Sequence, residues 1–227
     1  MFMPRGSRSQ PTAPTSTGDA SERILAAAER CIDRHGIRKT TMDDIASEAG
    51  LSRPSVYRYF ADRDDLIIEL ISRHARALVD RTHKSISRQG SLPDQIVESL
   101  LYTADHGRRD PLTRYSIDPD GTSLGRQMIA SGTSEMIRAE IWDPLLDAAL
   151  ANNEPPPGLP RSDIHLWLGN VAKMLMRRLE DGDGDLKCYR SILRRFVAPA
   201  FASSDAQVSA RSTTSGHQAR PDHGPMT

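Results

Sequence analysis

Apolar residues recur along most of this chain at intervals of three and four positions, the spacing that puts them on one face of an α-helix. No stretch of useful length alternates apolar and polar residues as a half-buried strand does. The pattern therefore predicts an all-α protein. Its expected helices span residues 19–36, with Asp19 and Glu22 as a capping box, then 41–50, 52–60, 63–83, 92–102, a short stretch within 107–122, 123–150 with a kink at Pro144, 162–180 and 185–201.

The segment 41–50 has the features of a short helix with defined ends. The hydroxyl of Thr41 can cap the free amides at a helix start, and two aspartates follow in the first turn, where the helix dipole favours negative charge. Ile45 and Ala49 share one face, and Gly50 can adopt the left-handed conformation that ends a helix. We therefore expect a sharp turn at Gly50.

A second short helix is predicted directly after this turn. Ser52 can cap it, and Pro54 suits its first turn because the amides there have no partner inside the helix. Val56 and Phe60 form its apolar anchor, which leaves a face of arginine, tyrosine and serine outside. The two helices have the form of a helix-turn-helix, although an ordinary two-helix corner with a solvated basic face has the same outline.

The outward face of this second helix suits duplex DNA. Arginine can pair bidentately with guanine or hold phosphates, and tyrosine and serine hydroxyls can donate to phosphate oxygens. We expect Arg53 to read a base and Arg63, at the start of the next helix, to hold a phosphate. The residues predicted to contact DNA are Thr41, Ser52, Arg53, Pro54, Ser55, Tyr57, Arg58, Tyr59 and Arg63.

Helix 21–35 and the run T-T-M-D-D-I-A-S-E-A-G-L-S-R-P-S-V-Y-R-Y-F-A-D-R-D-D-L strongly resemble the DNA-binding domain of the TetR family of bacterial transcriptional regulators. The likeness rests on the threonine pair, the I-A-x-x-A-G core and the Y-x-x-F run before a basic residue and a leucine. Pro54 departs from the pattern, in which glycine or an unhindered residue often stands. The resemblance implies a homodimer that dimerises through its last two helices and holds an inducer among its middle helices.

Composition separates the chain into two expected domains and two tails. Residues 1–18 carry two arginines and no acid among prolines, serines and threonines, and residues 203–227 are also poor in apolar groups, so both tails are predicted to be disordered. The DNA-binding domain is expected over 19–66, and the ligand-binding and dimerisation domain over 67–202. With 30 basic and 30 acidic residues the formal net charge is zero, so any DNA contact must be local.

Catalytic and metal patterns fail on their context. G-T-S-L-G at 121–125 matches a nucleophile elbow, but D-P-D-G precedes it instead of a strand, so Ser123 is not expected to be catalytic. D-G-D-G-D at 181–185 imitates a calcium loop, but Leu186 and Ile192 stand where glycine and a bidentate glutamate are needed. The seven histidines include no pair at zinc-ligand spacing with a carboxylate partner. We therefore expect no enzyme activity, no metal and no cofactor.

Cysteine usage and hydropathy indicate a cytoplasmic protein. Cys31 and Cys188 are distant and unpatterned, which favours reduced core thiols over a redox pair. No apolar run approaches the roughly 20 residues that span a bilayer, and the N-terminus lacks the apolar core of a signal peptide. No membrane contact is expected.

The helices after residue 67 suggest a pocket and an interface. A ring of aromatic and methionine side chains suits a small, largely apolar effector, although a plain helical core has the same composition; the resemblance favours the pocket. Its predicted residues are Tyr102, His106, Tyr115, Met128, Met136 and Trp142. Apolar stripes wider than one chain needs predict a homodimer through the last two helices. The predicted interface residues are Trp167, Val171, Leu175, Ile192, Phe196 and Val197.

As the resemblance implies, the hypothesis is a one-component regulator that binds a partly palindromic operator in double-stranded DNA as a homodimer and represses until a ligand releases it. Two alternatives stay open. One is an architectural DNA-binding protein with no effector, and the other is an enzyme with an appended DNA-binding domain.

Overall fold

The structure, a computed structural model, describes residues 17–86, 90–117, 123–152, 158–182 and 185–202. Within these ranges every regular element is a helix and none is a strand, as predicted. The chain divides into two compact units, and the boundary between Leu70 and Ile71 lies inside helix α4 (Arg63–Ile86). The expected division after residue 66 falls about one helical turn earlier in the same helix. The predicted tails lie outside the described residues except for 17 and 18, which begin the first helix.

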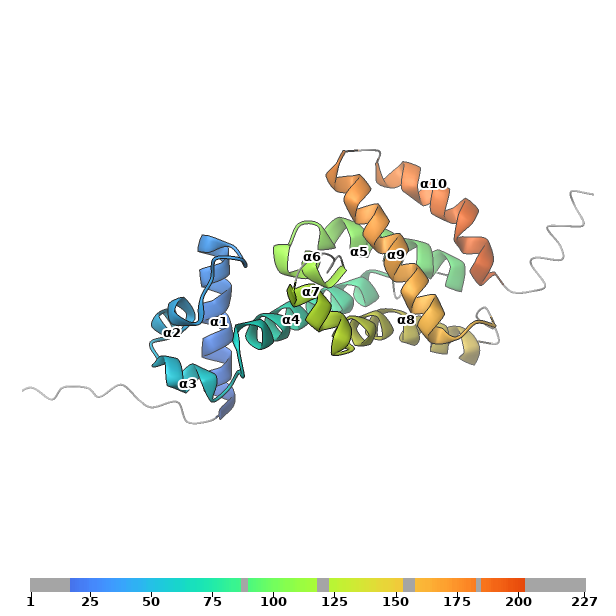
Figure 1. Ribbon diagram of the computed structural model, residues 1–227. Helices are drawn as coiled ribbons and strands as arrows, with labels where there is room; N and C mark the ends of the chain where they lie inside the picture. Colours follow the sequence, from blue (N-terminus) through green and yellow to red (C-terminus); the bar gives the residue numbers. More distant parts are fainter. Residues whose placement is uncertain (1–16, 87–89, 118–122, 153–157, 183–184, 203–227) are drawn as a thin grey trace, which may run out of the picture. The chain divides into compact units, whose positions relative to one another are not determined.

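The first unit contains α1 (Thr17–His35), α2 (Met42–Ala49), α3 (Arg53–Tyr57) and the start of α4 (Figure 1). Helix α1 packs against α2, and α2 against α3. The fully buried side chains of this core come from all four helices and include Ile24, Ala28, Ile45, Val56, Leu66 and Ile67. Helix α3 is too short to be stable alone, so it depends on packing within this core, which α1 covers.

Charged side chains of α1 also hold the end of α2. The guanidinium of Arg23 donates to the carbonyl of Ala49 at 2.9 Å. Arg30 and Arg34, one turn apart on α1, both pair with Glu48 of α2. Together these bonds fix the C-terminal end of α2, which leads into the turn of the helix-turn-helix.

Three of the helix ends predicted for α1, α3 and α4 are wrong. Helix α1 begins at Thr17, so Asp19 lies inside the first turn and is not its cap. Helix α3 ends at Tyr57, and Phe60 is buried beyond the helix instead of within it. Helix α4 runs to Ile86, past the expected end at residue 83, because its apolar stripe continues to Ile86, which is only 2% exposed.

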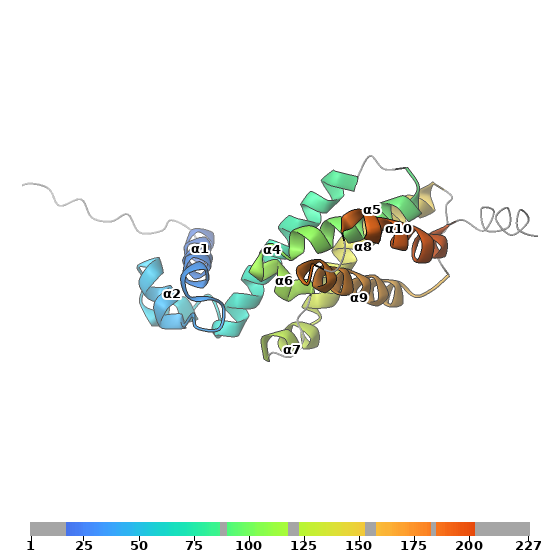
Figure 2. The same ribbon diagram turned by 90° about the horizontal axis from the view of Figure 1, so that it is seen from above.

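The second unit is organised around α5 (Leu92–Gly107), with which α8, α9, α10 and the final 3₁₀ turn all make contact (Figures 1 and 2). Its other elements are α6 (Pro111–Ile117), α7 (Ser123–Ala130), α8 (Thr133–Ala151), α9 (Arg161–Glu180), α10 (Leu186–Phe196) and the 3₁₀ turn Ala198–Phe201. The buried core joins Val97 and Leu100 of α5 to Trp142 of α8 and Leu168 of α9. Helix α5 is therefore the central helix of this unit.

Three of the predicted elements have different bounds in the structure. The helix expected over 123–150 is two helices, because Gly132 takes a left-handed conformation with φ 75° and separates α7 from α8. Pro144 lies inside α8, which continues to Ala151. Helix α5 continues to Gly107, five residues past the expected end at 102. The last helix ends at Phe196, and Pro199 sits in the 3₁₀ turn that follows.

Candidate functional site

Helix α2 begins with a complete capping box, which the sequence predicts only in part. The N–H of Asp44 donates to the hydroxyl of Thr41 at 3.2 Å, and the N–H of Thr41 donates back to the Asp44 carboxylate at 2.9 Å. Hydrogen bonds from the hydroxyl and the backbone of Thr41 lower the pKa of Asp44 below its ordinary value. Gly50 ends the helix in the left-handed region with φ 65°, as expected. Thr41 remains exposed at the start of the motif.

Helix α3 is held by the predicted cap and anchor. The N–H of Ser55 donates to the hydroxyl of Ser52 at 3.3 Å, and the two serine hydroxyls lie 2.8 Å apart. Pro54 lies in the first turn, where it removes no helical hydrogen bond. Val56 is fully buried and Phe60 is 6% exposed, so this side faces the core. The opposite side of α3 is therefore turned to solvent.

Arg53 and Tyr57 form the centre of this outward face. The guanidinium of Arg53 donates to the Asp43 carboxylate at 2.9 Å and to the Tyr57 hydroxyl at 3.3 Å, and it lies 5.5 Å from the centroid of the Tyr57 ring. The hydrogen bond with Tyr57 and the charge of Asp43 raise the pKa of Arg53. The side chains of Arg53 and Asp43 are 54% and 66% exposed, so solvent screens this pair. Arg53 is thus oriented but still available to a ligand.

Arg63 does not fit the predicted role of phosphate contact. Its Nε donates to the carbonyl of Thr40 at 2.6 Å, one Nη donates to the carbonyl of Ile37, and the other pairs with Asp64 at 2.7 Å. The side chain is only 29% exposed. In this conformation the guanidinium ties the segment between α1 and α2 to the start of α4. This role could not be predicted from the sequence, because the two carbonyl acceptors are more than twenty residues away from Arg63.

Three exposed cations near the motif are better placed for phosphates. Arg58 follows α3, and Arg38 and Lys39 precede the Thr41 cap of α2. Within the part of the chain that the structure describes, none of these side chains has an ion pair or hydrogen bond. Residues 17–70 contain eleven acidic and eight basic side chains, so this unit is not basic as a whole. Arg38 and Lys39 are not among the predicted DNA contacts, although two basic residues directly before a helix cap are a readable signal.

The six residues of the predicted pocket do not meet in one cavity. Tyr102 and His106 stack on each other with ring centroids 3.8 Å apart, and both line a separate hollow with Arg190. Met128 is fully buried, and Met136 is 46% exposed. Of the six residues, only Trp142 lines the apolar cavity of the second unit, while Tyr115 is half-buried outside it. The expected ring is therefore wrong, because residues equally apolar in sequence face different neighbours.

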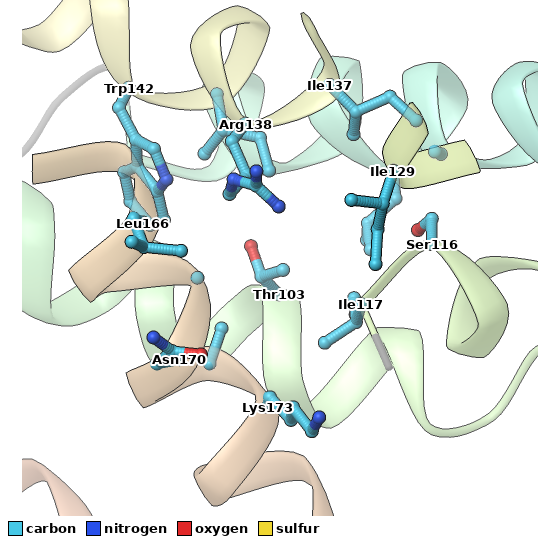
Figure 3. A pocket seen from close by; sticks show the side chains of 15 residues that line it. Thr103, Ser116, Ile117, Ile129, Ile137, Arg138, Trp142, Leu166, Asn170 and Lys173 are labelled. Atoms are coloured by element: carbon cyan, nitrogen blue, oxygen red, sulfur yellow. The ribbon is translucent and has the colours of Figure 1, made fainter. Parts of the chain in front are cut away.

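The apolar cavity has a volume of about 200 Å³ and lies wholly within the second unit (Figure 3). Side chains from α4 to α9 line it, and most are aliphatic, with Ile117, Ile129, Ile137 and Leu166 among them. Its polar lining residues are Thr103, Ser116, Arg138, Asn170 and Lys173, besides the indole of Trp142. Such a lining suits a mostly apolar small molecule with a polar group.

Beside the cavity, a charged network connects α8 to α9. His165 is 3% exposed, and its two ring nitrogens lie 3.1 Å from a Glu135 oxygen and 2.9 Å from an Asp143 oxygen. Arg138 donates to Glu135 at 2.8 Å, and Arg161 donates to Asp143 at 2.9 Å. Burial tends to raise the pKa of Glu135, but the hydrogen bonds from Arg138 and His165 outweigh it and leave that pKa below its ordinary value.

The predicted interface residues fall into two groups. Trp167 and Ile192 are exposed by 43% and 42%, and Phe196 by 71%. Leu175 and Val197 are buried in the core of the same unit, and Val171 is half-buried against that core. Leu175 and Val197 are therefore wrongly placed as interface residues, because they belong to the core of their own unit, whereas the placement of Val171 stays a prediction. Leu166 and Met174 of α9 are exposed apolar residues that the sequence analysis did not include.

The other candidates from the sequence concern metal ligands, cysteines, a nucleophile and membrane spans. In the described ranges no three histidine, cysteine, aspartate or glutamate side chains come together as a metal site would require. Cys31 is buried as expected, but Cys188 is exposed, which corrects its assignment to the core. Ser123 is exposed at the start of α7, and the calcium-like run lies partly outside the described residues. None of the described helices is long and apolar enough to cross a membrane.

Known proteins resemble this chain in both sequence and fold. The family described as "Bacterial regulatory proteins, tetR family" matches residues 24–70. An uncharacterized HTH-type transcriptional regulator of Mycobacterium bovis is 31% identical over 124 residues, which cover 54% of this chain and 62% of that protein. A second such regulator, from Mycobacterium tuberculosis, is 28% identical over 188 residues, or 82% of this chain and 88% of the relative.

Among solved structures, the transcriptional regulator FadR of Bacillus subtilis, crystallised in complex with stearoyl-CoA, has a similar fold. Its TM-score is 0.55 at 17% identity, and the match covers 79% of this chain and 98% of FadR. At that identity the likeness concerns the fold alone. The matched segment 24–70 contains α2, α3 and their caps, so sequence and structure agree on the same motif. This segment gives the N-terminal unit the helix-turn-helix of the TetR family of bacterial transcriptional regulators, and the chain is similar to regulators of this kind.

Proposed function

We propose that this protein is a repressor that binds a partly palindromic operator as a homodimer and releases it when a small, largely apolar ligand binds the second unit. The observation that carries the proposal is the outward face of α3, where Arg53, Tyr57 and Arg58 are exposed on a helix capped at Ser52 and anchored at Val56. A well-packed helix with exposed donors on one side is what base and phosphate recognition needs.

Base reading is assigned to Arg53. Its guanidinium is already held in a fork between Asp43 and Tyr57, and a guanine edge offers two acceptors to such a fork. Because the pair with Asp43 is more than half exposed, exchanging that carboxylate for a base edge costs little. The hydroxyls of Thr41 and Tyr57 complete the polar face toward DNA.

Phosphate contact is assigned to the exposed cations Arg38, Lys39 and Arg58. These side chains lie on both sides of the motif in sequence and have no partner among the described residues that must be displaced. Each cation that neutralises a phosphate releases condensed counterions and makes binding more sensitive to salt. Tyr59, half-buried after α3, and the exposed Pro54 complete the predicted contact surface.

Dimerisation is assigned to the exposed apolar residues of α9 and α10. Five of the large exposed apolar side chains lie on these two helices: Leu166, Trp167, Met174, Ile192 and Phe196. Exposed aromatic and aliphatic groups of this size are typical of an interface that a second copy covers by two-fold symmetry. In such a dimer two copies of α3 can enter successive major grooves, roughly 34–36 Å apart.

Ligand control is assigned to the apolar cavity. FadR, a neighbour in fold, was crystallised with stearoyl-CoA, which supports an apolar ligand for this fold. A ligand lowers operator affinity only by the difference in its own affinity for the two conformers of the dimer. An architectural protein without an effector lacks this coupling, and an enzyme would consume the ligand, so ligand-dependent DNA release without turnover favours the repressor.

Selection of random duplex DNA by the purified full chain tests the proposal. We expect an inverted repeat with half-site centres about one helical turn, or 10 base pairs, apart or at multiples of that spacing. Arg53→Ala should relax the preference at one position of each half-site and cost about 1–3 kcal/mol there. Arg81→Ala is a matched control, because Arg81 is an exposed arginine of α4 outside the helix-turn-helix. Failure to enrich any sequence would refute the operator-binding role.

A further inference from the structure

The apolar cavity of the second unit contains buried polar groups that have no partner. The hydroxyl of Thr103, the indole N–H of Trp142 and the Nε of Arg138 are all buried without a hydrogen bond among the described residues. Thr103 and Trp142 are 2% and 1% exposed. Figure 3 shows these three groups turned toward the same space, from α5 and α8. Three unsatisfied groups around one cavity indicate a missing partner, since buried polar groups are normally paired.

The chemistry of these groups defines that partner as a hydrogen-bond acceptor. An indole N–H and a guanidinium can only donate, and a threonine hydroxyl can donate as well. Two of the lining residues, Arg138 and Lys173, are cationic, and among the described residues none that lines the cavity is acidic. A carboxylate supplies two acceptor oxygens and the opposite charge, so it satisfies all three donors at once.

Arg138 is positioned for this role by its neighbours. A Cβ at position 169 would lie 2.7 Å from the Cδ of Arg138, so Gly169 lets the side chain cross α9 closely. One Nη of Arg138 donates to Glu135, whose other oxygen lies 3.1 Å from the buried His165. Glu135 therefore neutralises part of the charge and orients the guanidinium, while Nε stays without an acceptor.

The size of the cavity limits the rest of the ligand. Its volume of about 200 Å³ is below the roughly 300–1,000 Å³ of sites for drug-sized ligands. The walls opposite the donors are aliphatic, with Ile117 and Ile129 among them. We propose that the cavity binds a compact monocarboxylate with an apolar body, whose carboxylate accepts hydrogen bonds from Arg138, Trp142 and Thr103. The role of this ligand as the effector rests on the function proposed above.

Calorimetric titration with a matched pair of probes, octanoate and 1-octanol, tests the inference on the full chain. The two share an apolar body and differ in the carboxylate, so octanoate should bind at least about tenfold more tightly. Arg138→Met should remove that preference, and Thr103→Val should reduce octanoate affinity several-fold with little effect on 1-octanol. Arg161→Met is the matched control, because Arg161 pairs with Asp143 and Asp147 beside the same network but does not line the cavity.

Three binding results would contradict the proposed carboxylate site. Equal affinity for octanoate and 1-octanol, or an unchanged preference in Arg138→Met, would exclude a carboxylate site. Tighter binding of stearoyl-CoA than of octanoate would replace the compact acid by a long acyl thioester. If Arg138→Met does not fold, as circular dichroism would reveal, Trp142→Phe removes one donor and keeps an aromatic core residue, and it must weaken octanoate but not 1-octanol.

The DNA experiment separates this inference from the proposed function. Octanoate binding that depends on Arg138, in a protein that enriches no DNA sequence, would refute the repressor and retain the carboxylate site. Operator binding that octanoate leaves unchanged, despite its binding, would refute the effector role alone. Operator binding with no octanoate binding would refute the carboxylate site and retain the DNA-binding regulator.

Discussion

Replacing Arg63 by methionine separates a structural role from a DNA contact. The guanidinium donates to the carbonyls of Thr40 and Ile37 and pairs with Asp64, and both charged side chains are 29% exposed. A hydrogen bond from a charged group contributes about 1.5–3 kcal/mol, and the exposed pair with Asp64 contributes at most about 1 kcal/mol. Because part of this is screened by solvent, we expect Arg63→Met to lower the free energy of unfolding of the first unit by about 2–4 kcal/mol. Methionine keeps the apolar stem and removes the donors.

Hydrogen exchange on the full chain measures this loss where it should occur. The amides of α2 (Met42–Ala49) should exchange faster in Arg63→Met, while those of α9 in the second unit should not change. Arg58→Met is the matched control, because Arg58 is exposed and has no side-chain partner among the described residues. It should leave exchange unchanged and reduce the slope of log K against log salt for duplex DNA by about 0.9.

The opposite pattern would refute this reasoning. If Arg63→Met leaves α2 exchange unchanged and reduces the salt slope by about 0.9, Arg63 holds a phosphate, as the sequence predicts, and the bonds to Thr40 and Ile37 contribute no stability. A reduced slope together with faster exchange would assign both roles to the same side chain.

Three further predictions test the interface, a buried carboxylate and a helix cap. Phe196 is 71% exposed, so a side chain of roughly 200 Å² can bury roughly 140 Å² in a dimer, which stabilises the dimer by about 3 kcal/mol per subunit. Trp167→Ser with Phe196→Ser should therefore give monomers in sedimentation. A dimer with intact helices would exclude this interface. Burial tends to raise the pKa of Asp110, but its hydrogen bonds with His74 and Thr113 outweigh it and hold that pKa well below its ordinary value. Asp110→Asn should therefore destabilise the second unit in urea at pH 7, and the difference should shrink as pH falls below about 4, where the unfolded carboxyl takes up its proton; a pH-independent difference would contradict the ionic role. Thr41→Ala should cost about 1 kcal/mol of stability through the capping box, measured by exchange of the α2 amides, and an unchanged protection would show that the cap is dispensable.

The helix-turn-helix could be derived from the sequence because its determinants are local. Thr41, Gly50 and Ser52 act on amides and carbonyls within three or four residues, so the residue type and its spacing decide the outcome. The anchor at Val56 and the exposed face around Arg53 follow from helical periodicity alone. The all-α class could be predicted for the same reason, since the spacing of apolar residues within each segment indicates a helix.

The break between α7 and α8 marks the limit of periodicity. Apolar residues keep a helical spacing through Ile129, Ile137 and Ile141, so the sequence alone favours one helix there. Gly132 can continue a helix or leave it, so its residue type alone does not determine the left-handed conformation that it takes.

Only the tertiary structure determines which apolar side chains of the last two helices are buried and where the cavity lies. Leu175 and Phe196 are both apolar residues in amphipathic helices, yet one is fully buried and the other 71% exposed. The difference depends on which side α5 covers. The cavity likewise needs Thr103 of α5 and Arg138 of α8 to face each other, which no spacing within either helix encodes. A local pattern specifies which side of a helix is apolar, but only the assembled packing determines what covers that side and where space is left.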